Sequence, residues 1–257
     1  MTLGIRPGAV YGLLRELRIA AEDEGPLVVE GPPALAEALR RELSRGAAPG
    51  AVRGGSPEGA DAFVCVLAGQ VTEQEEERLK LAHRKGVPTV AVLAGPGLAP
   101  RVPYVLASDV VRVPAGSGFP VDEIARVVAN RLGERGTSLA ARVPALRQAV
   151  CEELIETFSR RTAIIGAAVF VPGADFPVIT LAQMRMVLRI AAAHGVKVDQ
   201  QRLPEILGVL AGGYAFRGLA RRLLGVVPVA GFAVCAAVAY AGTRALGEAA
   251  VRYFAAA

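Results

Sequence analysis

The chain of 257 residues contains no tryptophan, few aromatic residues (5%), three cysteines, two histidines and three lysines. The thiols are far apart and none belongs to a C-x-x-C pair, which argues against a disulfide framework or a cysteine metal site. They are expected to be reduced packing residues. The amino terminus has no basic cluster followed by a long apolar core, so no export signal is expected and most of the protein is expected inside the cell.

Small apolar residues and arginine dominate what is present. Residues of the AVILMFWYC class make up 53% of the chain, 47 of them are alanine, and 26 of the 29 cations are arginine. This composition excludes a disordered, collagen-like or disulfide-rich protein. Residues 1–142 hold 17 cations and 17 anions, whereas residues 143–257 hold 12 and 7, so the net charge of +5 lies in the second half. Because lysine clusters and interleaved aromatics are missing, nucleic-acid binding is not expected.

The first half alternates short apolar runs with helical patterns. Strands are predicted at 26–30, 51–53, 62–67, 88–93 and 110–113, and helices at 9–22, 34–43, 73–84 and 121–131. Strands that are apolar throughout are buried on both faces, and their alternation with helices requires right-handed parallel crossovers. We therefore predict a small doubly wound, mostly parallel α/β sheet in residues 1–138. A loop at 133–138 would end it, and an all-α domain would occupy residues 139–257.

The second half shows only helical patterns. One long helix is expected from Val143, a capping box at Thr180-Leu181-Ala182-Gln183 would start another, and Arg185 and Arg189 would mark that helix's polar side. Ala233, Ala237 and Ala241 form a small-residue stripe that would allow close helix packing, unless the register is fortuitous.

Two charge-free runs raise the question of a membrane. Residues 162–171 are too short to cross a bilayer, and residues 223–243 are long enough but interrupted by Gly225, Pro228 and Gly231. A re-entrant or interfacial hairpin and the buried helices of a soluble bundle fit equally well. Arginines bound both runs, as is typical of segments that meet anionic headgroups, and this favours association with the cytoplasmic face of a membrane.

The segment Gly59-Ala60-Asp61 with the apolar strand after it, and the later Val87–Leu93 "VPTVAVL", resemble the central part of an Era-type GTPase domain. The resemblance implies a GTPase-like fold, yet the residues of its chemistry are missing. A phosphate-binding loop needs glycine, a lysine and a Ser or Thr hydroxyl, whereas Gly31-Pro32-Pro33-Ala34 follows the first strand. Ala94-Gly95-Pro96-Gly97 stands where the family would show its guanine-reading Asn-Lys-x-Asp. We therefore expect a degenerate GTPase-like domain that binds no nucleotide.

The second half is similar to an uncharacterised bacterial helical domain that follows Era-like GTPase modules and is predicted to associate with the inner membrane. The resemblance covers about 110 residues and is carried by these segments: Val171–Asp175 "VPGAD", Thr180–Met184 "TLAQM", His194-Gly195, Gly212-Gly213 and Ala241–Gly247 "AGTRALG". It implies membrane association and supplies no catalytic residues.

Together these observations predict a non-enzymatic regulatory or adaptor protein, with no catalytic residue, cofactor or metal. Its expected partners are the cytoplasmic membrane face and a protein partner or second copy. A soluble two-domain binding or oligomerisation protein is the alternative, and an NTPase with an atypical phosphate site is less favoured. The turn Gly116-Ser117-Gly118 could cradle an anion or be an ordinary loop. Candidates for a structural or interaction role are Asp175, Arg185, Arg189, Arg221, Arg222 and Arg244.

Overall fold

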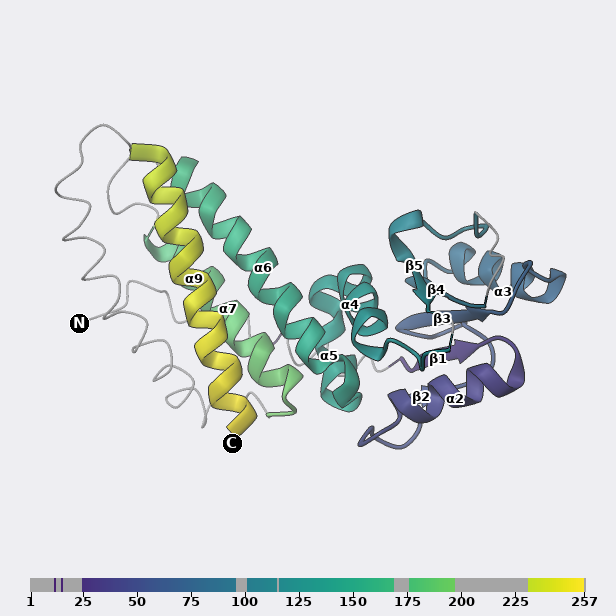
Figure 1. Cartoon of the computed structure of the whole chain (residues 1–257). Helices are drawn as coiled ribbons and strands as arrows, with labels where there is room; N and C mark the ends of the chain where they lie inside the picture. The colour runs from purple at the N-terminus through teal and green to yellow at the C-terminus, as the bar shows by residue number, and fades with distance from the viewer. Residues whose placement is uncertain are drawn as a thin grey trace. The chain divides into compact units, whose positions relative to one another are not determined.

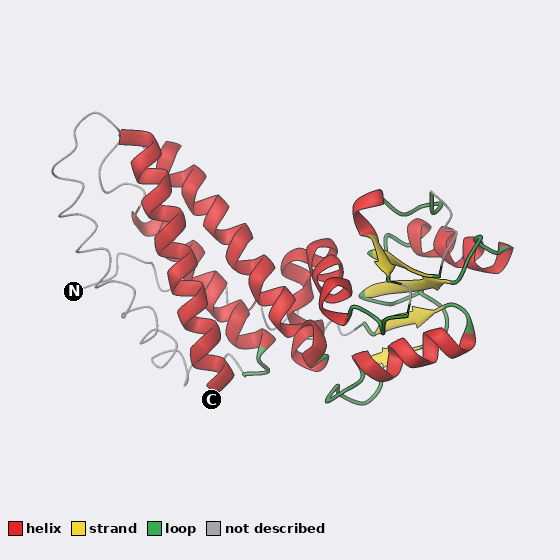
Figure 2. Cartoon of the chain, in the orientation of Figure 1, coloured by secondary structure: helices red, strands yellow, loops and turns green. Residues whose placement is uncertain are grey.

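The structure is a computed structural model that describes residues 12, 15, 25–95, 101–114, 116–168, 176–196 and 231–256 (Figure 1). The chain forms two compact units, one of Glu22–Glu153 and one of Met1–Ala21 with Leu154–Ala257. A parallel sheet with helices is followed by a region of helices alone (Figure 2), which confirms the predicted fold class. The helix expected at 9–22 lies almost wholly outside the described residues.

The α/β unit is built on one five-stranded sheet. Its strands are β1 Leu27–Glu30, β2 Val52–Arg53, β3 Ala62–Leu67, β4 Thr89–Ala94 and β5 Val110–Val113. They lie in the order β2-β1-β3-β4-β5, and every neighbouring pair is parallel. The short β2 and the strand β5 are therefore the two edges. All five strands were predicted to within one or two residues, because continuous apolar runs are typical of strands buried on both faces.

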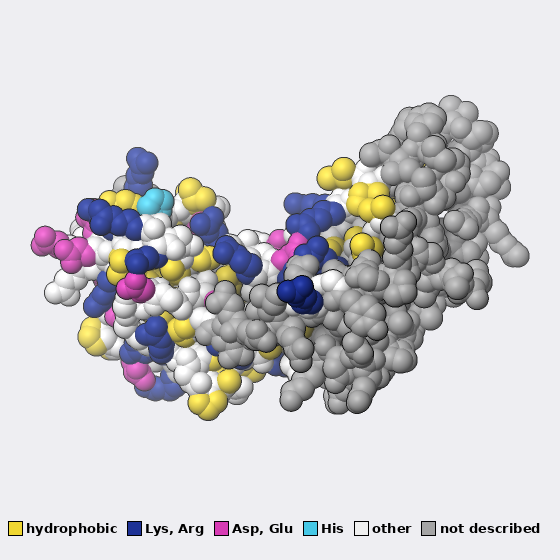
Figure 3. Space-filling view, turned by 180° about the vertical axis from the view of Figure 1, so that it is seen from behind, with side chains coloured by type: hydrophobic (Ala, Val, Ile, Leu, Met, Phe, Trp, Pro, Cys, Tyr) yellow, Lys and Arg dark blue, Asp and Glu magenta, His cyan; other side chains and the backbone are white. Residues whose placement is uncertain are grey.

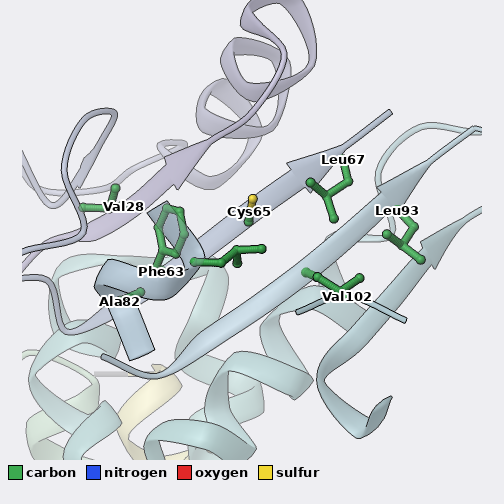
Figure 4. Close-up of a cluster of buried hydrophobic side chains, with 9 residues drawn as sticks. Val28, Phe63, Cys65, Leu67, Ala82, Leu93 and Val102 are labelled. Carbon is green, nitrogen blue, oxygen red and sulfur yellow. The ribbon is translucent and has the colours of Figure 1, made fainter. Parts of the chain in front are cut away.

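Three helices accompany the sheet, α2 Pro33–Leu43, α3 Glu73–Arg84 and α4 Val121–Leu132. One face of the sheet carries a core cluster whose central side chains are Phe63, Cys65 and Leu67 of β3, packed with Leu79 and other residues of α3 and β4 (Figure 4). All four are 0% exposed. Because right-handed crossovers lead from β1 to β2 on one side and from β3 to β4 on the other, α2 and α3 cover opposite faces.

Helix α3 begins where its sequence predicts. Thr72 is the N-cap, its hydroxyl accepts a hydrogen bond from the backbone N–H of Glu75, and the Glu75 carboxylate accepts one in return from the Thr72 N–H. This capping box satisfies two of the amides that a helix start leaves unpaired. The acidic run that begins at Glu73 is thus the start of a helix.

The loop predicted at 133–138 is wrong, because Gly133–Arg135 form a 3-10 turn and α5 follows at Gly136–Arg142. Gly136 is buried, and a Cβ at this position would lie 3.2 Å from the side chains of Leu132 and Val150. Glycine is therefore favoured here because two side chains approach the backbone closely, and it lies within a helix and not in a loop.

The end of α5 is anchored to the amino-terminal edge of the sheet. Arg142 Nη2 donates to the Gly25 carbonyl over 2.7 Å and lies 3.1 Å from Asp61 Oδ2. Asp61, the acidic residue of the Gly59-Ala60-Asp61 segment, thus holds a helix of the same unit to the starts of β1 and β3.

The helical unit contains the second part of α6 Pro144–Ala168, with α7 Phe176–Ala193 and α9 Gly231–Ala256. Gly166 of α6 lies against Cys235 of α9, where a Cβ would be 3.0 Å from the Cys235 carbonyl oxygen. Near the other end Gly247 of α9 lies against Ile155 of α6. Helices α6 and α9 are therefore antiparallel and meet closely at a glycine at each end.

The expected helix cap at Thr180 is wrong, and the alanine stripe of α9 lies on the surface. Helix α7 begins at Phe176 with Pro177 in its first turn, so Thr180 lies inside the helix and does not cap it. Ala233, Ala237 and Ala241 are exposed, and the face of α9 that packs against α6 and α7 carries other small residues instead, such as Thr243 and Gly247.

Candidate functional site

The carboxyl ends of the parallel strands are the usual ligand-binding edge of a doubly wound sheet. After β1, Gly31 has φ +148° and packs so tightly on Val66 that a Cβ would collide with its carbonyl oxygen. Pro32 is the N-cap of α2 and Pro33 its first residue, with no side-chain cap. Neither proline has an N–H to donate, so the start of α2 offers a phosphate fewer amides than an ordinary helix start.

A hollow of about 320 Å³ does lie at this edge, toward β4 and β5. It is lined by Leu35, Ala94, Gly95, Val113, Pro114 and Gly116–Phe119. Among these residues there is no ionisable side chain, so they offer neither a cation for a phosphate nor a carboxylate for a metal ion. In the described part of the chain, no group of three His, Cys, Asp or Glu residues is placed to hold a metal.

Beside β1 the side chain of Glu30 is the centre of an ionic cluster. Its Oε1 accepts a hydrogen bond from the Gly55 N–H over 2.5 Å and lies 3.7 Å from Arg40 Nη1, and its Oε2 lies 3.0 Å from Arg78 Nη1. Arg40 belongs to α2 and Arg78 to α3, so this carboxylate connects helices on opposite faces of the sheet. The carboxylate at the end of β1 therefore has a structural role, because it holds these helices and the Gly55 loop to the sheet.

In the helical unit, three buried polar side chains form one layer across α6, α7 and α9. The hydroxyls of Thr162 and Thr243 lie 2.8 Å apart, and Gln183 Nε2 donates to Thr243 Oγ1 over 2.8 Å. Thr162 and Thr243 are 0% exposed and Gln183 is 4% exposed. Because buried polar groups need partners, these bonds fix the relative register of the three helices. We call these three residues the polar layer.

In the described parts of α6, α7 and α9, the polar layer separates a charge-free end from a charged remainder. On one side of it lie residues 162–168 of α6, 176–184 of α7 and 231–243 of α9, and none of these residues is charged. The contact between Gly166 and Cys235 places the α6 and α9 segments side by side. We call these three segments the apolar tip.

The surface of the apolar tip exposes hydrophobic side chains. Ile164 is 69% exposed and Val178 is 51% exposed, while Ala233, Cys235 and Ala237 are also exposed. At a rise of 1.5 Å per residue the three segments are about 10 to 20 Å long. No helix in the described part of the chain is long and apolar enough to cross a bilayer.

Charged side chains gather at the other side of the polar layer. Glu156 Oε2 accepts a hydrogen bond from the Tyr240 hydroxyl over 2.8 Å, and its Oε1 accepts one from Arg160 Nε over 2.6 Å. Arg244 Nη1 lies 3.5 Å from the same carboxylate and its Nε donates to Glu248. The Tyr240 hydrogen bond, followed by Arg160, lowers the pKa of Glu156 below its ordinary value.

This cluster leaves cations at the surface, since the side chains of Arg160 and Arg244 are 73% and 51% exposed. Arg161 is exposed as well, and its guanidinium lies 5.4 Å from the Phe158 ring centre. Figure 3 shows hydrophobic side chains of the helical unit next to a group of basic side chains. We call Arg160, Arg161 and Arg244 the cationic band.

The predicted interaction residues have different fates. Arg244 belongs to the cationic band next to the apolar tip. Arg185 is half-buried and Arg189 is 6% exposed, so α7 does not present them on a solvated face as expected. Asp175, Arg221 and Arg222 lie outside the described residues.

The three thiols are free, and two of them are buried as expected. Burial raises the pKa of Cys65 and of Cys151 to about 12, so both stay protonated near neutral pH. Cys235 differs, because it is exposed on the apolar tip.

Comparison with known protein families, with curated proteins and with solved structures finds no match for this chain.

The sequence reasoning missed the polar layer. A signal for it does exist, because Thr162 and Thr243 are the terminal residues of two charge-free runs and Gln183 immediately precedes the last residue of a third. Their pairing across 81 and 60 residues of chain follows only from the packing of the helices.

Proposed function

We propose that the chain is a non-enzymatic adaptor or regulatory protein. In this proposal the α/β unit is a degenerate GTPase-like module that binds no nucleotide, and the helical unit docks on the cytoplasmic face of a bacterial membrane. The observation that carries the proposal is the apolar tip, an exposed charge-free end of three helices that a buried polar layer separates from a cationic band.

The dimensions of the apolar tip fit one leaflet of a bilayer. The hydrocarbon core of a bilayer is about 30 Å thick, so one leaflet offers about 15 Å, which lies within the tip's estimated length of about 10 to 20 Å. Interfacial insertion buries apolar surface below the headgroups and leaves cations at headgroup level. Ile164 would be immersed, while Arg160 and Arg161 would meet anionic lipid at the surface.

The absence of enzymatic function is supported by the edge where a phosphate would bind. The prolines after β1 remove amides, the carboxylate of Glu30 is engaged by Arg40 and Arg78, and the hollow near β4 and β5 has no ionisable lining. An NTPase would need a cation at this edge to neutralise the phosphate charge, and the lining residues of the hollow supply none. A thermal shift measurement with GTP or ATP at millimolar concentration tests this point, and a raised midpoint would contradict it.

Vesicle sedimentation tests the docking. We expect the protein to sediment with vesicles that contain phosphatidylglycerol and much less with vesicles of phosphatidylcholine alone. Ile164→Glu should abolish sedimentation, because it places a charge in the immersed surface. Leu106→Glu is the matched control, since Leu106 is 60% exposed on the α/β unit. Equal loss in both variants, or no binding to anionic vesicles, would refute the proposal.

A second candidate, a soluble oligomer, is favoured by the exposed alanine face of α9. Ala233, Ala237, Ala241, Ala245 and Ala249 follow one another at four-residue spacing and are all exposed. Small residues at this spacing let a second helix approach closely. Light scattering coupled to size-exclusion chromatography distinguishes the two candidates. A stable dimer that Ala241→Glu dissociates, together with no vesicle binding, would favour the oligomer.

A further inference from the structure

A second surface, in the α/β unit, gathers several arginine side chains. A groove of about 630 Å³ runs between α2 and the edge strand β2, which lie next to each other in Figure 1. Its lining consists of Glu37, Arg40, Arg41, Ser44, Arg45, Val52, Arg53 and Gly54. Four of these eight residues are arginines and one is acidic. By contrast, residues 1–142 as a whole hold equal numbers of cations and anions. We call this surface the arginine groove.

The four arginines are not equivalent. Arg40 is fixed, because its Nε and Nη2 bond Glu37 Oε2 and its Nη1 donates to the Val29 carbonyl. Arg45 pairs with Glu42 at 2.7 Å but remains 74% exposed. Arg41 and Arg53 are exposed, and among the described residues no carboxylate lies within ion-pair distance of either. Arg41 on α2 and Arg53 on β2 thus have no acidic partner here; because β2 pairs Arg53 with Val28, whose side chain packs on the α3 face, the side chain of Arg53 starts from the sheet face opposite α2.

The floor of the groove offers backbone hydrogen-bonding groups as well. Leu27 donates to the Ala51 carbonyl, and the register pairs Leu27 with Val52. In a parallel ladder this directs the N–H and C=O of Val52 away from β1, toward the open edge. An extended peptide can pair with such an edge strand.

From these two features we infer that the arginine groove binds an acidic segment of another protein in extended conformation, laid beside β2. The stripe from Glu37 to Arg45 on α2 is about 12 Å long at 1.5 Å per residue. This length matches about four residues of extended chain, whose side chains alternate between the two faces, so neighbouring acidic residues would meet Arg41 on one face and Arg53 on the other. The inference rests on the proposed adaptor role and names its partner class, but it does not depend on membrane docking.

Fluorescence anisotropy with the full-length protein tests the inference without vesicles. The probe is a fluorescein-labelled peptide of about eight consecutive Glu residues, which presents carboxylates on both faces, and the same peptide with Lys in place of Glu is the charge control. We expect the acidic peptide to bind and the basic one not to bind. The double variant R41E/R53E should weaken binding at least about tenfold, because two charge-assisted contacts become repulsive.

Arg112→Glu is the matched control, because Arg112 is exposed on β5, the opposite edge of the same sheet. A second variant, Val52→Pro, removes the outward N–H without altering charge, and it should weaken binding while the thermal unfolding midpoint shows that the unit remains folded. Unchanged binding in R41E/R53E, an equal loss in Arg112→Glu, or wild-type binding in Val52→Pro would overturn the inference. So would displacement of the peptide by inorganic phosphate or by a single-stranded oligonucleotide at lower concentration than by unlabelled peptide. If the acidic peptide does not bind while the protein still sediments with vesicles, the inference about the arginine groove is refuted and the docking proposal is unaffected.

Discussion

Substitution of Thr243 by valine tests whether the polar layer holds the helical unit together. Valine has nearly the same shape as threonine, so the change removes the hydroxyl and leaves the packing almost unaltered. Two hydrogen bonds of 2.8 Å are lost, one with Thr162 and one from Gln183. Thr162 keeps a second bond to the Ser159 carbonyl at 3.0 Å, whereas Gln183 Nε2 loses this acceptor in a buried position.

The magnitude follows from these partners. A net hydrogen bond contributes about 0.5–1.5 kcal/mol, so the loss of two costs about 1–3 kcal/mol. We therefore expect T243V to lower the free energy of unfolding by about 1–3 kcal/mol. T243S keeps the hydroxyl and loses one methyl group, which costs about 0.8 kcal/mol. Q183M removes the donor itself, so the double variant T243V/Q183M should be about 1 kcal/mol more stable than the sum of the single changes predicts.

Urea unfolding followed by far-ultraviolet circular dichroism measures these differences. With a slope of about 2–3 kcal/mol per molar urea, T243V should shift the midpoint of the helical unit's transition by about 1 M at unchanged slope. If T243V is as stable as T243S, or if the double variant shows no coupling, the polar layer does not stabilise the unit.

Three further predictions concern the thiols, the glycines of α9 and the Glu156 carboxylate. Of the three thiols, only Cys235 should react rapidly with Ellman's reagent in the native protein, and all three should react in denaturant; rapid reaction of a second native thiol would contradict the burial described above. Gly247→Ala should destabilise the protein by about 1–3 kcal/mol, because its Cβ would lie 2.6 Å from an isoleucine side chain of α6. Gly242→Ala, whose Cβ would have no other atom within 4 Å, should stabilise the protein by up to about 1 kcal/mol in the same urea unfolding experiment. The pKa of Glu156 is lowered in the folded state, so its contribution to stability is present at neutral pH and is lost as the pH falls through the folded pKa. Glu156→Gln should therefore lower the free energy of unfolding most at neutral pH and little in acid. A difference in unfolding free energy that does not depend on pH would refute this.

Much of the α/β unit could be predicted because its signals are local. The strand Ala62–Leu67 is apolar throughout and lies between turn residues, and the helix Glu73–Arg84 carries its own capping box. Each of these elements was predicted with the bounds that the structure shows. Burial on both faces and capping are properties of a few consecutive residues, so no knowledge of the rest of the fold is needed.

The helical unit was harder to predict because its signals are ambiguous or distant. The pattern of Thr180 and Gln183 is that of a capping box, yet a helix that already begins at Phe176 contains both. Near the end of the α/β unit, the run at 133–138 also has the glycines of a linker, but Gly136 is required for close packing. The polar layer depends on contacts between residues that lie far apart in sequence, and periodicity carries no information about such pairs.

The most direct test of the docking proposal uses the thiol of Cys235, which is exposed on the apolar tip. Its reaction rate with a membrane-impermeant, charged maleimide should be measured with and without phosphatidylglycerol-containing vesicles. If the apolar tip enters the leaflet, the vesicles should slow labelling at least about tenfold, and Ile164→Glu should restore the rate of the free protein. An unchanged labelling rate under conditions where the protein sediments with the vesicles would contradict insertion of the tip.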